Sequence, residues 1–493
     1  MERKALSMKK VLIVGAGLGG LAAGVLLQTK GFDVTIVEKN EHVGGKMMPV
    51  QLGEYSFDFG PNTITMPEVF QWLFEQAGER PEDYMPLVKL THHTNNFFTD
   101  GSQFSMSIDE RKMIQQLERL DPFAAEQYPA YLKEVKRIYD IAKSQFFYRT
   151  FSSWKDYTNP SLLKALLQVR PFETVDTFHQ RFFRNENIRN AFNRYATYIG
   201  SSPYTSPATF SLIGHLEMND GVYYVKGGNP RIAKGLGHVF QKAGGKLYTN
   251  CSVTEIIVKN KRAVGVEVNG EEKIDADIVI VNGDLLKAYP ALVKEQDRPH
   301  FKNKKAAEFE PSISAYVIMA AVKKRFSQLI HHQVYFSQDY KQEFYELFQK
   351  KTLPTDPTIY ICNSSYTDNT VAPGDNLFIL VNAPAVKEEN QEEMKAYREV
   401  VYRKLSQFGL DIKPSLVHER IVTPYEIEQT FGAFKGALYG VSSNRKMDSF
   451  LRPSNVSKDV KNLYFVGGTT HPGGGSPMVT ISGINVAMLI SSS

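Results

Sequence analysis

The chain of 493 residues is too long for one small domain, and its 42% hydrophobic content is enough for a sizeable core. A net charge of +5, from 58 basic and 53 acidic residues without a basic block, argues against a nucleic-acid partner. Cys251 and Cys362 stand far apart, and the histidine pairs at 92–93 and 331–332 lack partners at ligand spacing, so we expect no disulfide and no metal site.

The first predicted elements are a buried strand over 11–14 and a helix over 18–29, separated by a glycine turn. Gly15, Gly17 and Gly20 have the spacing G-x-G-x-x-G, which allows a tight turn, a backbone approach to pyrophosphate and close packing of helix on strand. The helix N-terminus would supply N–H groups to the phosphates. The expected contacts of this turn are Gly15, Ala16, Gly17, Gly19 and Gly20.

A second strand, FDVTIVEKN, ends at an acid about twenty residues after the glycine turn. A carboxylate at this place accepts both hydroxyl groups of a ribose, so we assign Glu38 to the adenosine end of a dinucleotide. Lys39, next to it, belongs to the same expected contact set.

The sequence VGGKM follows six residues after Glu38, and YSFDFGPNTITM comes soon afterwards. A second glycine pair with a basic residue resembles the long FAD-binding motif of amine oxidases and phytoene desaturases. Lys46 then meets the pyrophosphate or packs over the flavin edge; the alternative is a solvated surface lysine. The expected contacts of this stretch are Gly44, Gly45, Lys46, Gly60 and Pro61.

From about Met66 the pattern becomes helical and rich in aromatic residues. SLLKALLQV places four leucines, at 162, 163, 166 and 167, on one helical face. SQFFYRTFSSWKDY and FHQRFFRN mix aromatic with basic residues. Such a surface either sits on a membrane interface or is the solvated side of a helical core. No stretch is long enough to span a bilayer as a helix.

After this region the chain returns to strands that suit the dinucleotide domain, including DADIVIVNGD. In FAD proteins of this pattern the adenine end meets the backbone near Val253. Between 312 and 425 lie further apolar strands, such as ISAYVIMAAV and NLFILVNAP. We expect them to form a sheet that is covered on one face and lines a hydrophobic cavity on the other.

The chain closes with a strand over 463–466, the loop GGTTHPGGGSP and a helix beginning near Pro477. This repeats the strand–glycine–helix order of the N-terminus. The loop is expected to approach the flavin, with the first helical N–H groups directed at its ring. The predicted contacts are Gly467, Gly468, Met478 and Val479.

The predicted architecture is α/β, with a Rossmann-like FAD-binding domain (GR2-type), an inserted α+β substrate domain and a helical membrane-facing part. The segments 8–70, 222–290 and 455–493 form the discontinuous FAD-binding domain. The helical substrate and membrane-contact region spans 71–221, and 291–454 supplies the sheet and helices of the substrate domain.

Almost the whole chain resembles the bacterial phytoene desaturase superfamily of carotenoid-modifying flavoproteins. Stretches such as FDFGPNTITMPEVF, YIGSSPYTSPATFSLIGHL and GGTTHPGGGSPMVTISG are similar to its diaponeurosporene oxygenase branch. The resemblance implies FAD, a hydrophobic C30 carotenoid substrate, oxidation of a terminal methyl to an aldehyde, and a cytoplasmic protein bound peripherally to the inner face of the membrane. It favours membrane contact for the aromatic, basic region and leaves the oligomeric state open.

No nucleophilic triad or carboxylate pair indicates hydrolysis. His471 is a weak candidate for catalysis, with shaping of the glycine loop as the favoured alternative. Tyr439 is a candidate to line the substrate channel near the flavin, with packing alone as the favoured alternative. A carotene desaturase is the main alternative function; an amine oxidase and a flavin-binding carrier of isoprenoids are more remote. A cysteinyl flavin link in the C-terminal loop is excluded, because the loop has no cysteine.

Overall fold

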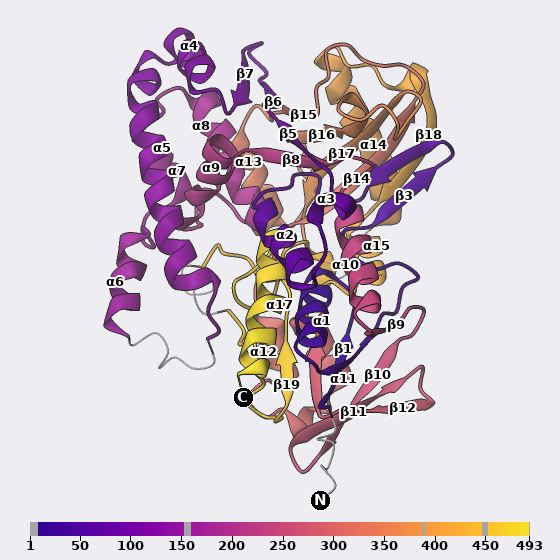
Figure 1. The fold of residues 1–493 in the computed structure, drawn as a ribbon. Helices are drawn as coiled ribbons and strands as arrows, with labels where there is room; N and C mark the ends of the chain where they lie inside the picture. Colours follow the sequence, from indigo (N-terminus) through magenta and orange to yellow (C-terminus); the bar gives the residue numbers. More distant parts are fainter. Residues whose placement is uncertain (1–7, 152–158, 387–389, 446–451, 493) are drawn as a thin grey trace, which may run out of the picture.

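A five-stranded parallel sheet forms the centre of the computed structural model, which describes residues 8–151, 159–386, 390–445 and 452–492 (Figure 1). Its strand order is β19-β13-β1-β2-β9. The bounds are β1 (Lys10–Val14), β2 (Asp33–Val37), β9 (Lys246–Tyr248), β13 (Ile278–Val281) and β19 (Leu463–Phe465). β1, β2, β13 and β19 carry buried hydrophobic residues, as expected for a parallel sheet, whereas Lys246 and Tyr248 of the edge strand β9 are exposed.

Helices cover one face of this sheet and a small antiparallel sheet covers the other. On the first face α1 (Leu18–Thr29) packs between α10 (Arg231–Lys242) and α17 (Ser476–Ser491), as Figure 1 shows. The second face packs on β10 (Val253–Lys259), β11 (Arg262–Val268) and β12 (Glu272–Asp275). The strands β1, β2 and β13 therefore contribute side chains to two different cores.

β1 lies at the centre of the sheet. β2 and β9 lie on one side of it, and β13 and β19 lie on the other. Where the order of strands reverses in this way, the carboxyl ends of the central strands border a crevice that binds ligands. The strands come from the segments 8–70, 222–290 and 455–493, so both glycine loops reach this edge.

A second, seven-stranded sheet has the order β18-β14-β17-β16-β15-β6-β7 and lies at the top of Figure 1. Its strands are β6 (His92–Phe97), β7 (Gln103–Ser107), β14 (Ser314–Val322), β15 (His332–Tyr335), β16 (Ile359–Asn363), β17 (Asp375–Ala383) and β18 (Leu416–Val422). The hairpin of β3 (Pro49–Leu52) and β4 (Tyr55–Asp58) covers one face of β14. We expected one face of this sheet to line a hydrophobic cavity. For β14 this expectation is wrong, because all its residues are buried.

The prediction of a helical region over 71–221 is wrong for its first part. β5 (Leu87–Leu90), β6 and β7 are strands, and β6 pairs with β15 in parallel. The polar sequence HHTNNF does not alternate as a half-buried strand would. Its extended form is fixed by pairing with a segment about 240 residues away.

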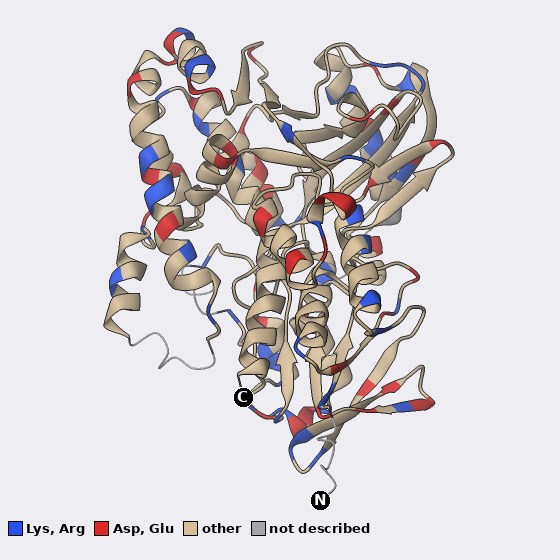
Figure 2. Ribbon diagram, viewed as in Figure 1, with Lys and Arg blue, Asp and Glu red and all other residues tan. Residues whose placement is uncertain are grey.

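The rest of this region is helical. Its longest helix is α5 (Pro122–Ala142), and Figure 2 shows acidic and basic residues interspersed along it. The other helices here are α4 (Glu110–Leu120), α6 (Pro160–Gln168), α7 (Val175–His179), α8 (Glu186–Asn193) and α9 (Ile213–His215). Part of the aromatic, basic stretch, 152–158, lies outside the described residues. Among the described helices, none has the length and apolar character needed to cross a membrane.

The remaining elements connect the two sheets or cover their edges. They are α2 (Pro67–Gln76), α3 (Pro81–Tyr84), β8 (Val222–Val225), α11 (Leu285–Leu292), α12 (Asn303–Glu308), α13 (Tyr340–Tyr345), α14 (Gln391–Gln407) and α15 (Pro424–Phe431). The pairing of β5 with β8 joins the helical region to the segment that returns to the parallel sheet.

Candidate cofactor site

The turn after β1 is closed by contacts with the end of β2. The N–H of Gly15 donates to the carbonyl of Val37 over 2.7 Å, and the N–H of Ala16 donates to Glu38 Oε2 over 2.8 Å. Gly15 has a φ of +98°, and a Cβ on Gly20 would lie 2.2 Å from the carbonyl oxygen of Gly15. Both positions therefore require glycine.

Two helices begin at this edge without a capping side chain. Gly17 is the N-cap of α1 and Gly475 is the N-cap of α17, and no described side chain accepts a hydrogen bond from either first turn. The first N–H groups of a helix need partners and carry partial positive charge. Both helix ends are thus available to an anionic or electron-rich ligand.

Asn282, at the end of β13, lies between the two glycine loops. Its Nδ2 donates to the carbonyl of Gly15 over 3.1 Å. A Cβ on Gly17 would lie 2.7 Å from this Nδ2, and one on Gly19 would lie 2.9 Å from Oδ1 of the same amide. The sequence interpretation missed this residue. Its position directly after the strand that pairs with β1 is the signal that could have identified it.

The predicted adenosine end is built around the buried carboxylate of Glu38. Its Oε1 accepts from the N–H of Asn40 over 2.9 Å, in addition to the bond from Ala16. The carbonyl of Glu38 accepts from the N–H of Cys251, which brings the half-buried Val253 to the same end. Lys39 is exposed, and its Nζ donates to the carbonyl of Gln429.

The second glycine pair lies against the first turn. The N–H of Gly44 donates to the carbonyl of Ala16 over 2.8 Å. Lys46 Nζ donates to the carbonyls of Ala437 and Leu438 over 2.9 and 2.6 Å, and burial lowers the pKa of this lysine to about 8. The alternative of a solvated surface lysine is therefore wrong, because the ammonium group is held inside the protein.

Gly60 and Pro61 lie on the loop after β4, and both keep some accessible surface. The side chain of Asn229, just before α10, donates to the carbonyl of Pro61 over 3.0 Å, and its N–H donates to Asp58. These bonds fix the loop after β4 to the segment just before α10.

Residues distant in sequence hold the C-terminal loop. Thr469 Oγ1 donates to Asp284 Oδ1 over 2.8 Å, and Ser482 Oγ donates to the carbonyl of His471 over 2.9 Å. Tyr439 packs on the loop through its Cβ and backbone, since a Cβ on Gly474 would lie 2.7 Å from the Cβ of that tyrosine. Gly467 is buried within the loop, whereas Gly468, Met478 and Val479 keep accessible surface.

His471 joins this loop to the helical region. Its Nε2 lies 2.7 Å from the carbonyl oxygen of Phe146, so the proton of the neutral ring is on Nε2. The ring meets Phe151 edge-on with centroids 4.6 Å apart, and burial lowers the histidine pKa to about 4. The geometry supports the interpretation that His471 shapes the loop.

The described residues fit a dinucleotide cofactor. The site combines two uncapped helix ends with glycines that leave no room for a Cβ, and a carboxylate stands at the end of the second strand. The sequence profile of the flavin containing amine oxidoreductase family matches residues 18–491. The chain belongs to this family and is an FAD-dependent oxidoreductase.

Two characterised relatives match over nearly the full length. The 4,4'-diaponeurosporene oxygenase of Staphylococcus haemolyticus (strain JCSC1435) is 34% identical over 98% of this chain and 97% of its own. The 1-hydroxycarotenoid 3,4-desaturase of Flavobacterium sp. (strain P99-3) is 35% identical over 98% of this chain and 99% of its own. The resemblance to the diaponeurosporene oxygenase branch is thereby confirmed.

Solved structures share the fold at low identity. A fatty acid isomerase from P. acnes aligns with a TM-score of 0.63 at 14% identity and covers 98% of both chains. Putrescine oxidase bound to putrescine aligns with a TM-score of 0.61 at 13% identity and covers 99% of both chains. At these identities the likeness concerns the fold alone.

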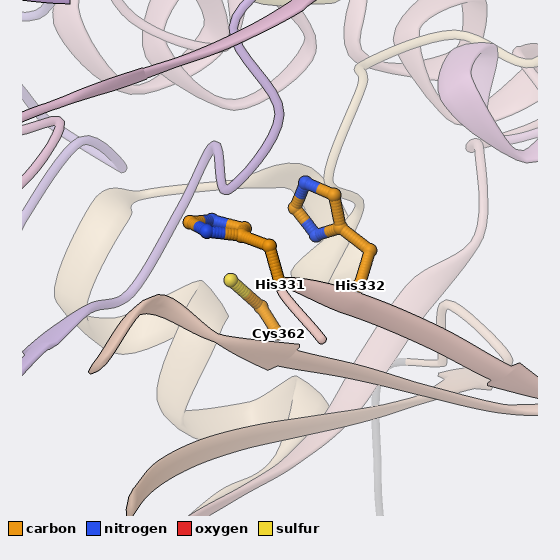
Figure 3. Close-up of side chains that lie close together, drawn as sticks. All are labelled: His331, His332 and Cys362. Carbon is orange, nitrogen blue, oxygen red and sulfur yellow. The ribbon is translucent and has the colours of Figure 1, made fainter. Parts of the chain in front are cut away.

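Figure 3 shows a cluster that the sequence interpretation did not expect, formed by His331, His332 and Cys362. One ligand-type atom from each lies within 4.8 Å of the others, and all three residues are buried. Burial lowers both histidine pKa values and raises the pKa of the thiol, and the nearby charge of Arg194 lowers the pKa of His332 further. Such surroundings disfavour both a thiolate and a bound cation.

Proposed function

We propose that this protein is an FAD-dependent carotenoid oxidoreductase that oxidises the terminal methyl group of a C30 diapocarotenoid, diaponeurosporene or diapolycopene, to an aldehyde. The observation that carries the proposal is the 34% identity, over 98% of this chain, to a protein named 4,4'-diaponeurosporene oxygenase. The assignment to the oxidoreductases is supported by the family and by the glycine-rich edge of the parallel sheet.

Removal of hydrogen pairs from the polyene is the second candidate. It is favoured by the 35% identity to a protein named 1-hydroxycarotenoid 3,4-desaturase. Both reactions begin by taking electrons from an allylic carbon of an apolar chain. They differ in whether oxygen is then added or a neighbouring proton is lost.

The glycine-rich edge would hold the cofactor along its length. Glu38 and the backbone near Val253 would meet the adenosine end, the first turn of α1 the pyrophosphate, and the first turn of α17 the flavin ring. Lys46 would position the loop at 437–438 next to it. The remaining residues of this set are Gly15, Ala16, Gly17, Gly19, Gly20, Lys39, Gly44, Gly45, Gly60, Pro61, Gly467, Gly468, Met478 and Val479.

Bound FAD supplies the chemistry by accepting electrons from the substrate. For the methyl oxidation the balance is RCH3 + H2O → RCHO + 4 H+ + 4 electrons, or RCH3 + O2 → RCHO + H2O. The neutral ring of His471 donates a hydrogen bond from Nε2 to the carbonyl of Phe146, and it is not arranged to transfer a proton to or from a substrate. The protein's task is to orient an apolar chain and to exclude water around the reacting carbon.

A groove of about 1190 Å³ is a candidate route for such a substrate. It runs between α2 and the last turns of α17, and Trp72, Tyr148, Phe151 and Met488 are among its lining residues. Phe151, in the wall of the groove, also touches the ring of His471, so this one side chain connects the groove wall with the C-terminal glycine loop.

The mouth of this groove lies next to exposed apolar side chains. Asn159, which lines the groove, caps α6, and Leu163 and Leu167 of that helix are 51% and 58% exposed. Phe172 is 70% exposed just after the helix. We propose that this surface rests on the inner face of the membrane in which carotenoids dissolve, with the protein otherwise in the cytoplasm.

Product mass tests the reaction. The protein is expressed in a bacterium that accumulates C30 diapocarotenoids, and the pigments are analysed by mass spectrometry. A gain of one oxygen with loss of two hydrogens on a terminal carbon is expected. Loss of hydrogen pairs alone would establish the desaturase instead, and unchanged pigments with FAD bound would refute both. Growth in labelled water or under labelled dioxygen then identifies the oxygen source.

Vesicle flotation tests the membrane surface. The double variant Leu163→Glu/Leu167→Glu should bind anionic phosphatidylglycerol vesicles at least about tenfold more weakly, because each buried leucine contributes about 1.5–3 kcal/mol. Tyr366→Glu, at an exposed position after β16, serves as the control. Equal binding of both variants and the wild type would show that α6 does not touch the bilayer.

A further inference from the structure

One wall of the groove between α2 and α17 is formed by the chain just after α5. This helix continues into a π turn, Lys143–Phe147, and Tyr148 then leaves helical geometry with φ −98° and ψ +42°. Residues 148–151 line the groove. The last carbonyl groups of a helix have no partner within the helix, so this wall segment, defined as 146–151, needs donors from other parts of the chain.

α17 and the loop before it supply these donors. Asn485, near the middle of α17, is 7% exposed, and its Nδ2 donates to the carbonyls of Phe147 and Arg149 over 2.8 and 3.1 Å. A backbone carbonyl only accepts, so both N–H groups of this amide face the wall segment. His471 Nε2 lies 2.7 Å from the carbonyl oxygen of Phe146 and adds a third bond.

Aromatic rings fix the two ends of the stretch between Phe147 and Phe151. Phe147 is buried and meets a tyrosine of α5 edge-on with centroids 6.1 Å apart. Phe151 is also buried and meets His471 edge-on at 4.6 Å. The carbonyl of Arg149 lies midway between these rings in sequence, and Asn485 donates to it. Asn485 therefore holds the middle of the wall segment against α17.

An ion pair links the wall to α2 more weakly. Lys143 Nζ lies 3.6 Å from Glu68 Oε1, and the two side chains are 40% and 52% exposed. An exposed ion pair contributes little, because water screens both charges. Loss of the Asn485 amide instead leaves the carbonyl of Phe147 without its donor in a buried place, which is more costly. The position of the wall segment thus depends more on Asn485 than on this ion pair.

Asn485 lies on the proposed route of the substrate. It lines the groove itself, and from Ser476, the first residue of α17, the helix rises about 14 Å to reach it. We place the flavin ring at that helix start, so a polyene that reaches it through the groove would pass Asn485 on the way. A wall that is fixed before the substrate arrives avoids the cost of ordering it on binding.

We propose that Asn485 is a positioning residue for the apolar substrate, because it holds the wall segment against α17 and so fixes the width of the groove. This inference rests on the proposed function, since it takes the groove as the route of the polyene to the flavin. Loss of the amide should weaken substrate binding and leave both the chemical step and FAD binding unchanged.

Two measurements on the holoenzyme test this role in Asn485→Leu, which keeps a side chain of similar size and removes both N–H donors. Anaerobic bleaching of the flavin is followed against the concentration of a C30 hydrocarbon polyene in detergent micelles. The half-saturating concentration should rise about tenfold, and the rate at saturation should stay within about threefold. Without substrate, hydrogen exchange of the amides at 146–151 should become about tenfold faster.

Asn485→Ala, which lacks the donors and favours a helix, should give the same two changes if the leucine variant does not fold. Asn187→Leu is the matched control. The Asn187 amide, in α8, also donates two hydrogen bonds between distant segments, to Asp100 Oδ2 over 2.8 Å and to Ser102 Oγ over 3.0 Å. This variant should keep the wild-type values of both measurements.

The positioning role and the carotenoid function fail in different ways. If the polyene bleaches the wild-type flavin and the Asn485 variants need no more of it for half-saturation, the positioning role is overturned. Unchanged hydrogen exchange at 146–151 would overturn it as well. A wild-type flavin that the polyene does not bleach at any concentration would instead refute the carotenoid function, whatever the exchange rates are.

Discussion

The two strand–glycine–helix units, β1–α1 and β19–α17, have the same order but are held in different ways. The first is closed by its own neighbour in the chain, since Gly15 and Ala16 bond to Val37 and Glu38. The second depends on Asp284, Tyr439 and Phe146, which come from three other segments. A cofactor that spans both units, as we propose, would be held by one turn formed between neighbouring elements and one loop held by distant segments.

The contact shared by the two units should give the largest effect. A Cβ on Gly483 in α17 would lie 2.1 Å from the carbonyl oxygen of Gly19 in α1. Gly483→Ala should therefore push the two helices apart, lower the free energy of unfolding by about 3 kcal/mol and release FAD. Thermal unfolding and the ratio of flavin to protein absorbance measure both consequences.

Gly237→Ala in α10 is the matched control for this change. Its added Cβ would meet Val43 at an ordinary 3.5 Å, so stability should rise by up to about 1 kcal/mol. If both alanine variants behaved alike, the close approach of α1 to α17 would have no part in joining the units.

Glu38 belongs to the first unit only, and its loss should have the next largest effect. Glu38→Ala removes the buried acceptor of Ala16 and the proposed ribose contact, so FAD should bind about ten- to hundredfold more weakly. Titration of the apoprotein with FAD, followed by flavin fluorescence, gives the Kd. Glu41→Ala, at an exposed position three residues on, should leave the Kd unchanged.

His471 belongs to the second unit only. His471→Ala loses the bond to Phe146, about 1 kcal/mol, but should keep turnover per bound FAD within about threefold. A loss of several orders of magnitude at full FAD occupancy would instead make this histidine catalytic.

The same variant should change the response to acid. The folded pKa of His471, about 4, lies below its usual value near 6.5, so stability is complete above pH 6.5 and falls as the pH drops toward 4. At pH 5.5 this histidine accounts for about 1 kcal/mol of the loss in wild type. Denaturant unfolding at pH 7.5 and 5.5 should show a smaller loss for His471→Ala, whereas His92→Ala, at an exposed position, should follow wild type.

Cys362 lies outside both units and should show the smallest effect. Cys362→Ser should change stability by about 1 kcal/mol or less and leave FAD binding intact, since the thiol is held neutral by burial. Metal analysis of the dialysed holoenzyme should find less than stoichiometric metal. Metal that is retained in Cys251→Ser and lost in Cys362→Ser would overturn the electrostatic argument against a cation at His331 and His332.

Local signals predicted much of the proposed cofactor site. The glycine spacing after β1 and the acid after β2 lie close together in sequence, so their geometry follows from two adjacent elements. Asn282 and Asp284 were missed, because neither has a pattern of its own. Their role arises only when β13 is placed next to β1.

Lys46 and the strands over 87–107 show the limits of local pattern. A lysine after a glycine pair looks the same in sequence whether solvated or buried, and only the carbonyls at 437 and 438 decide. Likewise β6 has no apolar alternation, and its pairing with β15 makes it a strand. The partners of both lie hundreds of residues away.

The sequence by itself determined the flavoprotein class and the glycine turn of β1–α1, because a tight turn, a helix start and a nearby acid are local requirements. The tertiary structure alone decided the anchors of the C-terminal loop, such as the bonds from Thr469 to Asp284 and from His471 to Phe146. These anchors carry no sequence signature, because they arise from packing between segments distant in the chain.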